Sequence, residues 1–180
     1  IEEYEKERHL YSEFAALVEG IIKVFLRSEN FKFQISNRAK DIEKVSEKID
    51  RKAQIGKKYK SLAEIEDLAG VRVVFYLESE KKKFLKKFLK EFNKCIIDAE
   101  EKYDPYGYRG QHFIFKLDSE RAALFEYRKY KCYKCEIQVS TILFHAWSEI
   151  EHDIIYKPFG DEMLLKTLDL DELKQSFEKV

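Results

Sequence analysis

Two acidic residues stand where a carboxylate has no evident structural use. Asp67 comes just before an apolar run that begins at Gly70, and Glu136 lies inside another run, between Cys135 and Ile137. A charge within a strand needs a partner, a metal or water. Two carboxylates near strand ends could hold Mg²⁺, which prefers oxygen ligands and bridges phosphates. The alternative, which the pattern alone favours, is that Asp67 caps a turn and Glu136 faces solvent.

Basic residues gather in the first third of the chain. Residues 36–60 contain nine Lys or Arg against four Asp or Glu. Within this segment Lys40, Lys44 and Lys48 are spaced to project from one face of a helix, beside Arg38. Like charges stacked in this way repel unless an anion joins them, and a polyphosphate is a plausible anion. A solvated face, tempered by interspersed carboxylates, is an equally good interpretation.

A glycine loop at residues 106–112, Tyr-Gly-Tyr-Arg-Gly-Gln-His, brings aromatic, cationic and imidazole groups to the start of a strand. A tyrosine here could stack on a base, and His112 could contact a phosphate or a hydroxyl. The alternative is a loop anchored by buried tyrosines.

Metal sites built from His or Cys are weakly indicated. His145, Glu149, His152 and Tyr156 share one face of an expected helix, but they lack the HExxH spacing of a zinc protease. The C-x-x-C at residues 132–135 has no second pair to complete a zinc site. The sequence also contains no GxxxxGK[ST] phosphate loop and no GxGxxG dinucleotide motif.

These residues must be positioned by a mixed set of elements. Hydrophobic spacing predicts an α+β fold, a mixed β-sheet flanked by helices, in the order α-α-β-α-β-β-α. The expected elements are one or two helices over residues 1–30, a helix over 36–52, a strand over 70–77, a helix over 81–94, a loop over 103–110, strands over 112–117 and 134–139, a helix over 141–157 and a helical tail. In the strands, alternation places Val71, Val73 and Phe75 on one face and Arg72 on the other.

Composition fits one domain over residues 1–180, and the pattern of elements divides it into a helical segment at 1–35, a core segment at 36–158 and a helical tail at 159–180. The 34 basic and 34 acidic residues cancel, and 38% of the chain is charged. Three cysteines without a disulfide framework or a signal peptide predict a reducing cytoplasm. The most apolar stretch, residues 14–26, is broken by charges and too short to span a bilayer, so no membrane association is expected.

Five segments in the same order resemble the synthetase domain of the RelA/SpoT family, over residues 36–158. The segments are Arg38-Ala-Lys40 with Lys48; residues 66–72, Glu-Asp-Leu-Ala-Gly-Val-Arg; residues 107–112; Glu136-Ile-Gln138 with Thr141; and residues 145–152 ending at Tyr156-Lys157. The resemblance implies a nucleotidyltransferase-like synthetase fold and pyrophosphate transfer from ATP to the ribose 3′-hydroxyl of GDP or GTP. No room is left for the hydrolase and regulatory domains of long members, so a short, synthetase-only member is expected.

The resemblance also implies roles on the ATP side. Arg38 and Arg72 would sandwich the adenine of ATP. Lys40 and Lys48 would neutralise its phosphates, and Asp67 would bind Mg²⁺. The chemistry agrees with this placement, because pyrophosphoryl transfer needs in-line approach and stabilisation of charge on the phosphate oxygens.

On the acceptor side, Tyr108 would stack on the base and His112 would contact phosphate. Glu136 would ligate Mg²⁺ or help to deprotonate the attacking hydroxyl. Gln138 and His145 would line the acceptor pocket.

Three positions depart from the common pattern of the family, and all lie on the acceptor side. The family often has Asn at Tyr106, Ser at Gly110 and Arg at Ser140. The acceptor is therefore left open between GDP or GTP and the acceptors of toxic small synthetases, which are adenine nucleotides or the 3′ end of tRNA. Lysines in residues 52–60 and in the helix from Lys81 could bind such an RNA. An antitoxin partner and a homo-oligomer also stay open, as does a non-catalytic RNA-binding module, against which the retained catalytic residues argue.

Overall fold

The computed structural model describes residues 1–103 and 109–151. Its elements are α1 (Glu2–Ser28), β1 (Phe33–Ala39), α2 (Ile42–Gln54), the 3₁₀ helix η1 (Leu62–Glu64), β2 (Ala69–Phe75), α3 (Glu78–Glu91), β3 (Ile96–Tyr103), β4 (Arg109–Phe115), α4 (Ser119–Ala123), the 3₁₀ helix η2 (Arg128–Tyr130), β5 (Cys135–Thr141) and α5 (Ile142–Glu151). The five strands form one sheet in the order β1-β2-β5-β4-β3. Only β2 and β5 run parallel among neighbours, so the expected mixed sheet of an α+β fold is confirmed.

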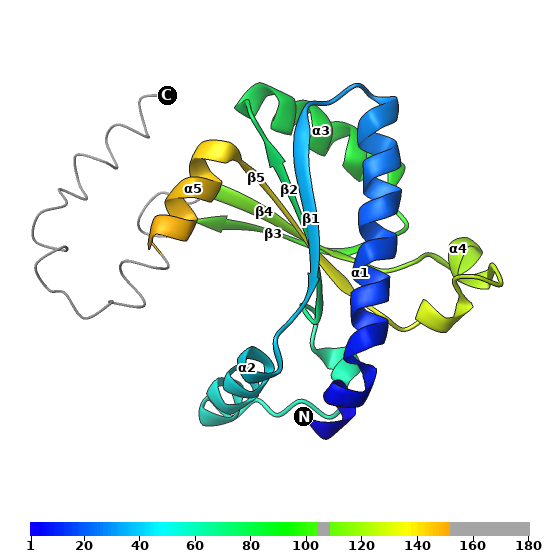
Figure 1. Cartoon of the computed structure of the whole chain (residues 1–180), viewed down its shortest axis with the longest axis vertical. Coiled ribbons are helices and arrows are strands. Elements are labelled where there is room, and N and C mark those ends of the chain that lie inside the picture. The colour runs from blue at the N-terminus through cyan, green and yellow to red at the C-terminus, as the bar shows by residue number, and fades with distance from the viewer. Residues whose placement is uncertain (104–108, 152–180) are drawn as a thin grey trace, which may run out of the picture.

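One face of the sheet carries the core. The side chains of Val73, Phe75, Ile137 and Phe113 on this face are all buried. Figure 1 shows α1 running along this side of the sheet, with α3 near its upper end. Burial of each large apolar side chain contributes about 1.5–3 kcal/mol, so this face holds much of the stability of the fold.

Phenylalanines join the two covering helices to the sheet and to each other. Phe84 of α3 lies 5.0 Å from Phe75 of β2 and 6.1 Å from Phe25 of α1, measured between ring centroids. Phe88, one turn further along α3, lies 5.4 Å from Phe113 of β4 in an edge-to-face arrangement. This packing follows from the helical spacing of aromatic residues among the lysines of α3.

The other face of the sheet carries polar side chains. Register pairs Arg38 with Gly70 and Gly70 with Glu136, so these positions share a face. Gln138 pairs with both Arg72 and His112, on the same face. The helix α5 lies on this side, opposite α1 (Figure 1). The predicted alternation in β2 and β5 is thus confirmed, and it sets one polar face against one apolar face.

Two strands were missed by the sequence-based prediction. Residues 36–39, expected to begin a helix, belong to the edge strand β1, and the helix that follows begins only at Ile42. The strand β1 starts at Phe33, inside the segment expected to be helical. The other edge strand, β3, was not expected at all. Its Asp-Ala-Glu-Glu-Lys sequence is too polar to resemble a strand, and pairing with β4 stabilises it.

The other predicted helices and strands differ from the observed ones mainly in the residues at which they begin and end. Residues 1–30 contain one helix, α1. Of the loop expected over 103–110, Tyr103 belongs to β3 and Arg109 and Gly110 belong to β4, and residues 104–108 lie outside the described residues. The helix expected over 141–157 begins at Ile142, and its part after Glu151 lies outside the described residues, as does the expected helical tail. Within the described residues, no helix is long and apolar enough to cross a membrane.

Candidate functional site

Asp67 lies at the entrance to β2, where two lysines hold its carboxylate. Lys40, just after β1, donates a hydrogen bond to Oδ2 at 2.5 Å, and Lys48 of α2 lies 2.7 Å from Oδ1 as an ion pair. Lys40 is fixed there because its backbone N–H donates to the carbonyl oxygen of Leu68. Burial would raise the pKa of Asp67, but the contacts with both lysines outweigh it, so the pKa lies below its ordinary value. The carboxylate is therefore charged at neutral pH.

The expected single row of lysines is only partly correct. Lys40 lies in the connection before α2, and Lys44 and Lys48 lie on the helix itself. Lys44 is exposed, and only Lys40 and Lys48 converge on Asp67. The sequence pattern grouped the three lysines correctly in the chain but did not show that a carboxylate joins two of them.

A cavity of about 210 Å³ opens on the polar face of the sheet beside this cluster. Six predicted site residues line it, together with Ser36, Asn37, Gly70 and Val71. The six are Arg38, Lys40, Asp67, Arg72, Glu136 and Gln138. The strands β1, β2 and β5 thus bring together residues that are up to a hundred positions apart in the chain.

Arg38 and Arg72 lie diagonally across the β1–β2 pair on the same face. Arg38 is opposite Gly70, and Arg72 is two residues further along β2. Diagonal neighbours in a sheet are about 7–8 Å apart. Both side chains line the first cavity, so the two arginines start from neighbouring positions beside the same space. Gly70, which lacks a side chain, keeps the space between them open.

The carboxylate of Glu136 is held at both oxygens. Its Oε1 is 2.9 Å from Nδ1 of His112 on β4, and its Oε2 accepts a hydrogen bond of 2.8 Å from Nε2 of Gln138. His112 is buried, and Glu136 is 15% exposed. These contacts fix the orientation of the carboxylate. Glu136 is therefore part of a polar network on this face and is only slightly exposed.

A second cavity, of about 330 Å³, adjoins the first. It shares Asp67 and Glu136 with the first cavity and adds His112 and Lys48. Its remaining lining residues are Arg51, Lys52, Tyr59, Glu66, Asp98, Ala99, Glu100 and Ile114. Two molecules bound in the two cavities would therefore meet at the two carboxylates.

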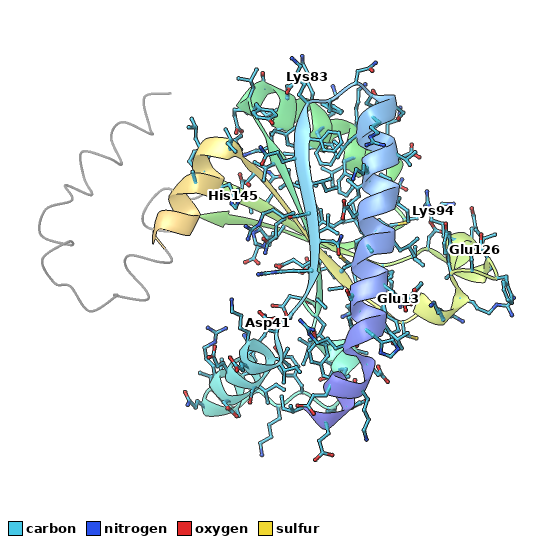
Figure 2. The ribbon with its side chains drawn as sticks, in the orientation of Figure 1. Glu13, Asp41, Lys83, Lys94, Glu126 and His145 are labelled. Atoms are coloured by element: carbon cyan, nitrogen blue, oxygen red, sulfur yellow. The ribbon has the colours of Figure 1, made fainter. Side chains whose placement is uncertain are left out.

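His145 reaches the site from α5. Its Nδ1 lies 3.4 Å from Nη1 of Arg72, and Figure 2 marks it between α5 and the strands. Tyr108, His152 and Tyr156 lie outside the described residues. Of the residues predicted for the acceptor, the structure thus places His112, Gln138 and His145 on one face.

The site can offer oxygen ligands to one hard cation. Oδ1 of Asp67 is buried, and Lys48 contacts it as an ion pair. Within residues 1–103 and 109–151, no group of three or more His, Cys, Asp or Glu side chains is placed to hold a metal ion. Asp67 and Glu136 fit Mg²⁺, which binds through one or two carboxylates and takes its other ligands from phosphates and water.

The C-x-x-C pair is not arranged as a metal site. Cys135 is buried in β5, whereas Cys132 is exposed. Burial and the neighbouring Glu136 raise the pKa of the Cys135 thiol, which keeps it protonated.

Sequence reasoning missed several lining residues. Gly70 had a usable signal, because a glycine inside a strand often marks close approach of a ligand. Asp98 and Glu100 could not be placed without β3. Arg51, Lys52 and Tyr59 line the second cavity together with residues of β3, which no local pattern shows.

Comparison with known proteins agrees with this geometry. Residues 37–161 match the family described as "Region found in RelA / SpoT proteins". The chain is also 28% identical over 145 residues to GTP pyrophosphokinase YwaC of Bacillus subtilis (strain 168). That alignment covers 79% of this chain and 65% of the relative, so the chain spans less than two thirds of the relative's length.

Solved structures show the same fold. The small alarmone synthetase 1 of Bacillus subtilis superposes with a TM-score of 0.73 at 20% identity, over 99% of this chain and 92% of that one. The same enzyme bound to its product pppGpp gives a TM-score of 0.72 at 18% identity, over 99% and 93% of the two chains. At these identities the likeness extends to the fold alone.

Proposed function

The chain belongs to the RelA/SpoT family, and on that premise we propose that it is an ATP-dependent pyrophosphokinase. It transfers the β,γ-pyrophosphate of ATP to the ribose 3′-hydroxyl of GDP or GTP and so makes the alarmone (p)ppGpp. The observation that carries the proposal is the pair of adjoining cavities that share Asp67 and Glu136. The name of the relative YwaC, a GTP pyrophosphokinase, and the pppGpp bound by the structural neighbour support the choice of substrates.

The first cavity would bind ATP. Arg38 and Arg72 stack on the two faces of the adenine, and each contact contributes about 0.5–1 kcal/mol. Lys40 and Lys48 leave Asp67 and move to the phosphates, where their charges offset those of the transferred group. Magnesium, held by Asp67 and Glu136, would neutralise the phosphate oxygens as negative charge develops there.

The second cavity would bind the acceptor nucleotide. Tyr108 stacks on the guanine, and His112 contacts phosphate. Of the other two residues that the resemblance assigns to the acceptor, Gln138 lines the first cavity and His145 contacts Arg72 there. Glu136, at the junction of the cavities, accepts the proton of the 3′-hydroxyl as its oxygen attacks the β-phosphorus of ATP. The bond between the α-phosphate and the β-phosphate breaks, and AMP leaves.

Labelled ATP tests this assignment. We expect the purified protein, given Mg²⁺ and ATP labelled at the β-phosphate, to label GDP and GTP at the 3′ position. Parallel reactions would contain AMP, ATP or deacylated tRNA as the acceptor. Labelling of an adenine nucleotide or of tRNA in place of GDP and GTP would show that the proposed acceptor is wrong and that the proposed transfer from ATP is correct. Absence of label in every acceptor would contradict the proposal.

We propose that the reaction takes place in the reducing cytoplasm. All three cysteines are free, and a nucleotide pool is needed as substrate. A homo-oligomer, an antitoxin and an RNA stay open as partners. The salt dependence of acceptor binding would separate an RNA from a nucleotide, because RNA releases several counterions on binding.

A further inference from the structure

A chain of polar side chains crosses the open face of the sheet. It begins at His145 on α5, whose Nδ1 is 3.4 Å from Nη1 of Arg72. Arg72 donates from Nε to Oε1 of Gln138 at 3.4 Å, and Gln138 donates from Nε2 to Oε2 of Glu136 at 2.8 Å. His112 completes the chain at Oε1 of Glu136. Gln138 is thus the link between an arginine of the first cavity and the carboxylate that both cavities share.

The orientation of the Gln138 amide follows from its two neighbours. A guanidinium group can only donate hydrogen bonds, and an ionised carboxylate can only accept them. The amide oxygen must therefore face Arg72, and the amide nitrogen must face Glu136. Among uncharged side chains of this length, only glutamine offers an acceptor and a donor at one end.

Strand register explains why Gln138 can contact both Arg72 and Glu136. Gln138 pairs with Arg72 across the parallel β2–β5 pair, and Glu136 precedes Gln138 by two residues on the same face of β5. Gln138 lines the first cavity beside Arg38 and Arg72, and it is not among the residues that line the second. Its position suits a contact with the donor-side arginine better than a contact with an acceptor in the second cavity.

We propose that Gln138 is a positioning residue that couples the binding of ATP to the orientation of Glu136. The inference rests on the proposed function. When adenine stacks on the face of the Arg72 guanidinium, Nε at its edge still donates to Gln138. The amide then fixes Oε2 of Glu136, while His112 fixes Oε1. Stacking of the donor base on Arg72 would keep this chain, and with it the carboxylate of Glu136, in the arrangement that the structure shows.

Two substitutions separate this role from acceptor binding. Gln138→Met keeps the length of the side chain and removes both hydrogen bonds. Gln138→Glu can still accept from Arg72 but places a second carboxylate against Glu136. We expect each to lower kcat by about 10–100-fold, the usual effect of losing a partner of a catalytic ligand, with less than about threefold change in the KM of ATP or acceptor. The matched control is Gln34→Met, a glutamine on the same face of β1 that lines neither cavity.

A measurement without turnover tests the hydrogen bonds themselves. In ¹H–¹⁵N spectra, the side-chain amide signal that disappears in Gln138→Met belongs to Gln138. We expect that signal to shift on addition of ATP with Mg²⁺, and the ATP-induced shift to be lost in Arg72→Lys. The signal should also shift in Glu136→Gln.

The outcomes are distinct. A raised acceptor KM with unchanged kcat would make Gln138 an acceptor ligand and overturn the inference. An amide signal that is insensitive to Arg72→Lys and Glu136→Gln would overturn it as well, even if the variants lose activity through misfolding. If the wild type transfers nothing to any acceptor, the proposed function fails, and the amide spectra still report whether Gln138 links Arg72 to Glu136.

Discussion

At the scale of single residues, the two lysines that are expected to bind the ATP phosphates contact the carboxylate that is expected to bind Mg²⁺. Lys40 and Lys48 both contact Asp67, and the side chains of all three are about one fifth exposed. A divalent cation approaching Asp67 meets two ammonium groups already in place. ATP phosphates would draw these groups away, so Mg²⁺ and ATP are expected to bind together more tightly than either binds alone.

Removal of one lysine should therefore strengthen metal binding in the absence of nucleotide. We expect Lys40→Met to bind Mn²⁺, a paramagnetic substitute for Mg²⁺, about tenfold more tightly than the wild type, a difference of ~1.4 kcal/mol. The same variant should bind ATP more weakly. Electron paramagnetic resonance measures the free Mn²⁺ directly. Lys44→Met, on the exposed side of α2, is the control, and equal Mn²⁺ affinity in all three proteins would contradict the account.

The two carboxylates should be needed for chemistry and not for folding. We expect Glu136→Gln to lower kcat by about 10²–10⁴-fold, because the proton of the attacking hydroxyl loses its acceptor. Asp67→Asn should abolish metal-dependent transfer and leave the two lysines without their counter-charge. Circular dichroism and steady-state kinetics check both statements. Near-normal turnover in either variant would remove the role given to that residue.

At the scale of elements, the sequence predicted the interior strands and missed the edges. The strands β2 and β5 are covered on one face by helices, so an alternation of apolar and polar residues was visible. It separated Arg72 from the apolar face of β2, and Glu136 and Gln138 from that of β5. Edge strands need less apolar surface. Phe33 and Ile35 alternate in β1, but the rest of that strand is polar, and β3 depends on its pairing with β4. Apart from Arg38, which the family resemblance supplied, the cavity residues on these edges were not predicted.

Gly70 should matter for the nucleotide and not for the strand. A Cβ atom added at this position would lie 3.8 Å from Cγ of Arg38 and 3.9 Å from the carbonyl oxygen of Glu136, which are ordinary contacts. We therefore expect Gly70→Ala to fold and to bind ATP nearly as the wild type does. Gly70→Leu would fill the space between Arg38 and Arg72 and should weaken ATP binding at least about tenfold, or ~1.4 kcal/mol. Titration calorimetry with a non-hydrolysable ATP analogue measures both, and tight binding by Gly70→Leu would exclude a base at this place.

Asp118, at the start of α4, should make stability depend on acid pH. Burial would raise the pKa of Asp118, but hydrogen bonds from the Arg121 backbone N–H, the Cys95 thiol and the Arg121 guanidinium hold it at about 2, below its ordinary 3.8. A lowered pKa stabilises the folded state above the unfolded-state pKa, and that contribution, on the order of 2 kcal/mol, is lost as the pH falls toward 2.

Asp118→Asn should accordingly lower the free energy of unfolding near neutral pH and have less effect the closer the pH comes to 2. Urea unfolding at several pH values measures the difference from the wild type. Glu120→Gln is the control, since this neighbouring side chain is 81% exposed. A difference that stays constant from pH 7 to pH 2 would show that the Asp118 charge is not responsible.

At the scale of the whole molecule, one face of the sheet stabilises the fold and the other forms the candidate site. The face of the sheet under α1 and α3 (Figure 1) holds the aromatic core. The opposite face holds the polar side chains and both cavities. Substitutions on the polar face should therefore change binding and catalysis with little loss of stability. Lys83 and the other lysines of α3 belong to a helix that packs on the core face (Figure 2). They are therefore on the side of the sheet away from both cavities and are not placed to act in the reaction.

The central claim is that one pyrophosphate group passes whole from ATP to the acceptor at Asp67 and Glu136. The most direct measurement is the stoichiometry of nucleotides by ion-exchange chromatography in a reaction of ATP, GDP and Mg²⁺. The account predicts one AMP for each ppGpp, no ADP, and no AMP when GDP is left out or when Glu136 is replaced by Gln. Formation of ADP would indicate transfer of a single phosphoryl group, and AMP release without an acceptor product would indicate hydrolysis; either result would contradict the account.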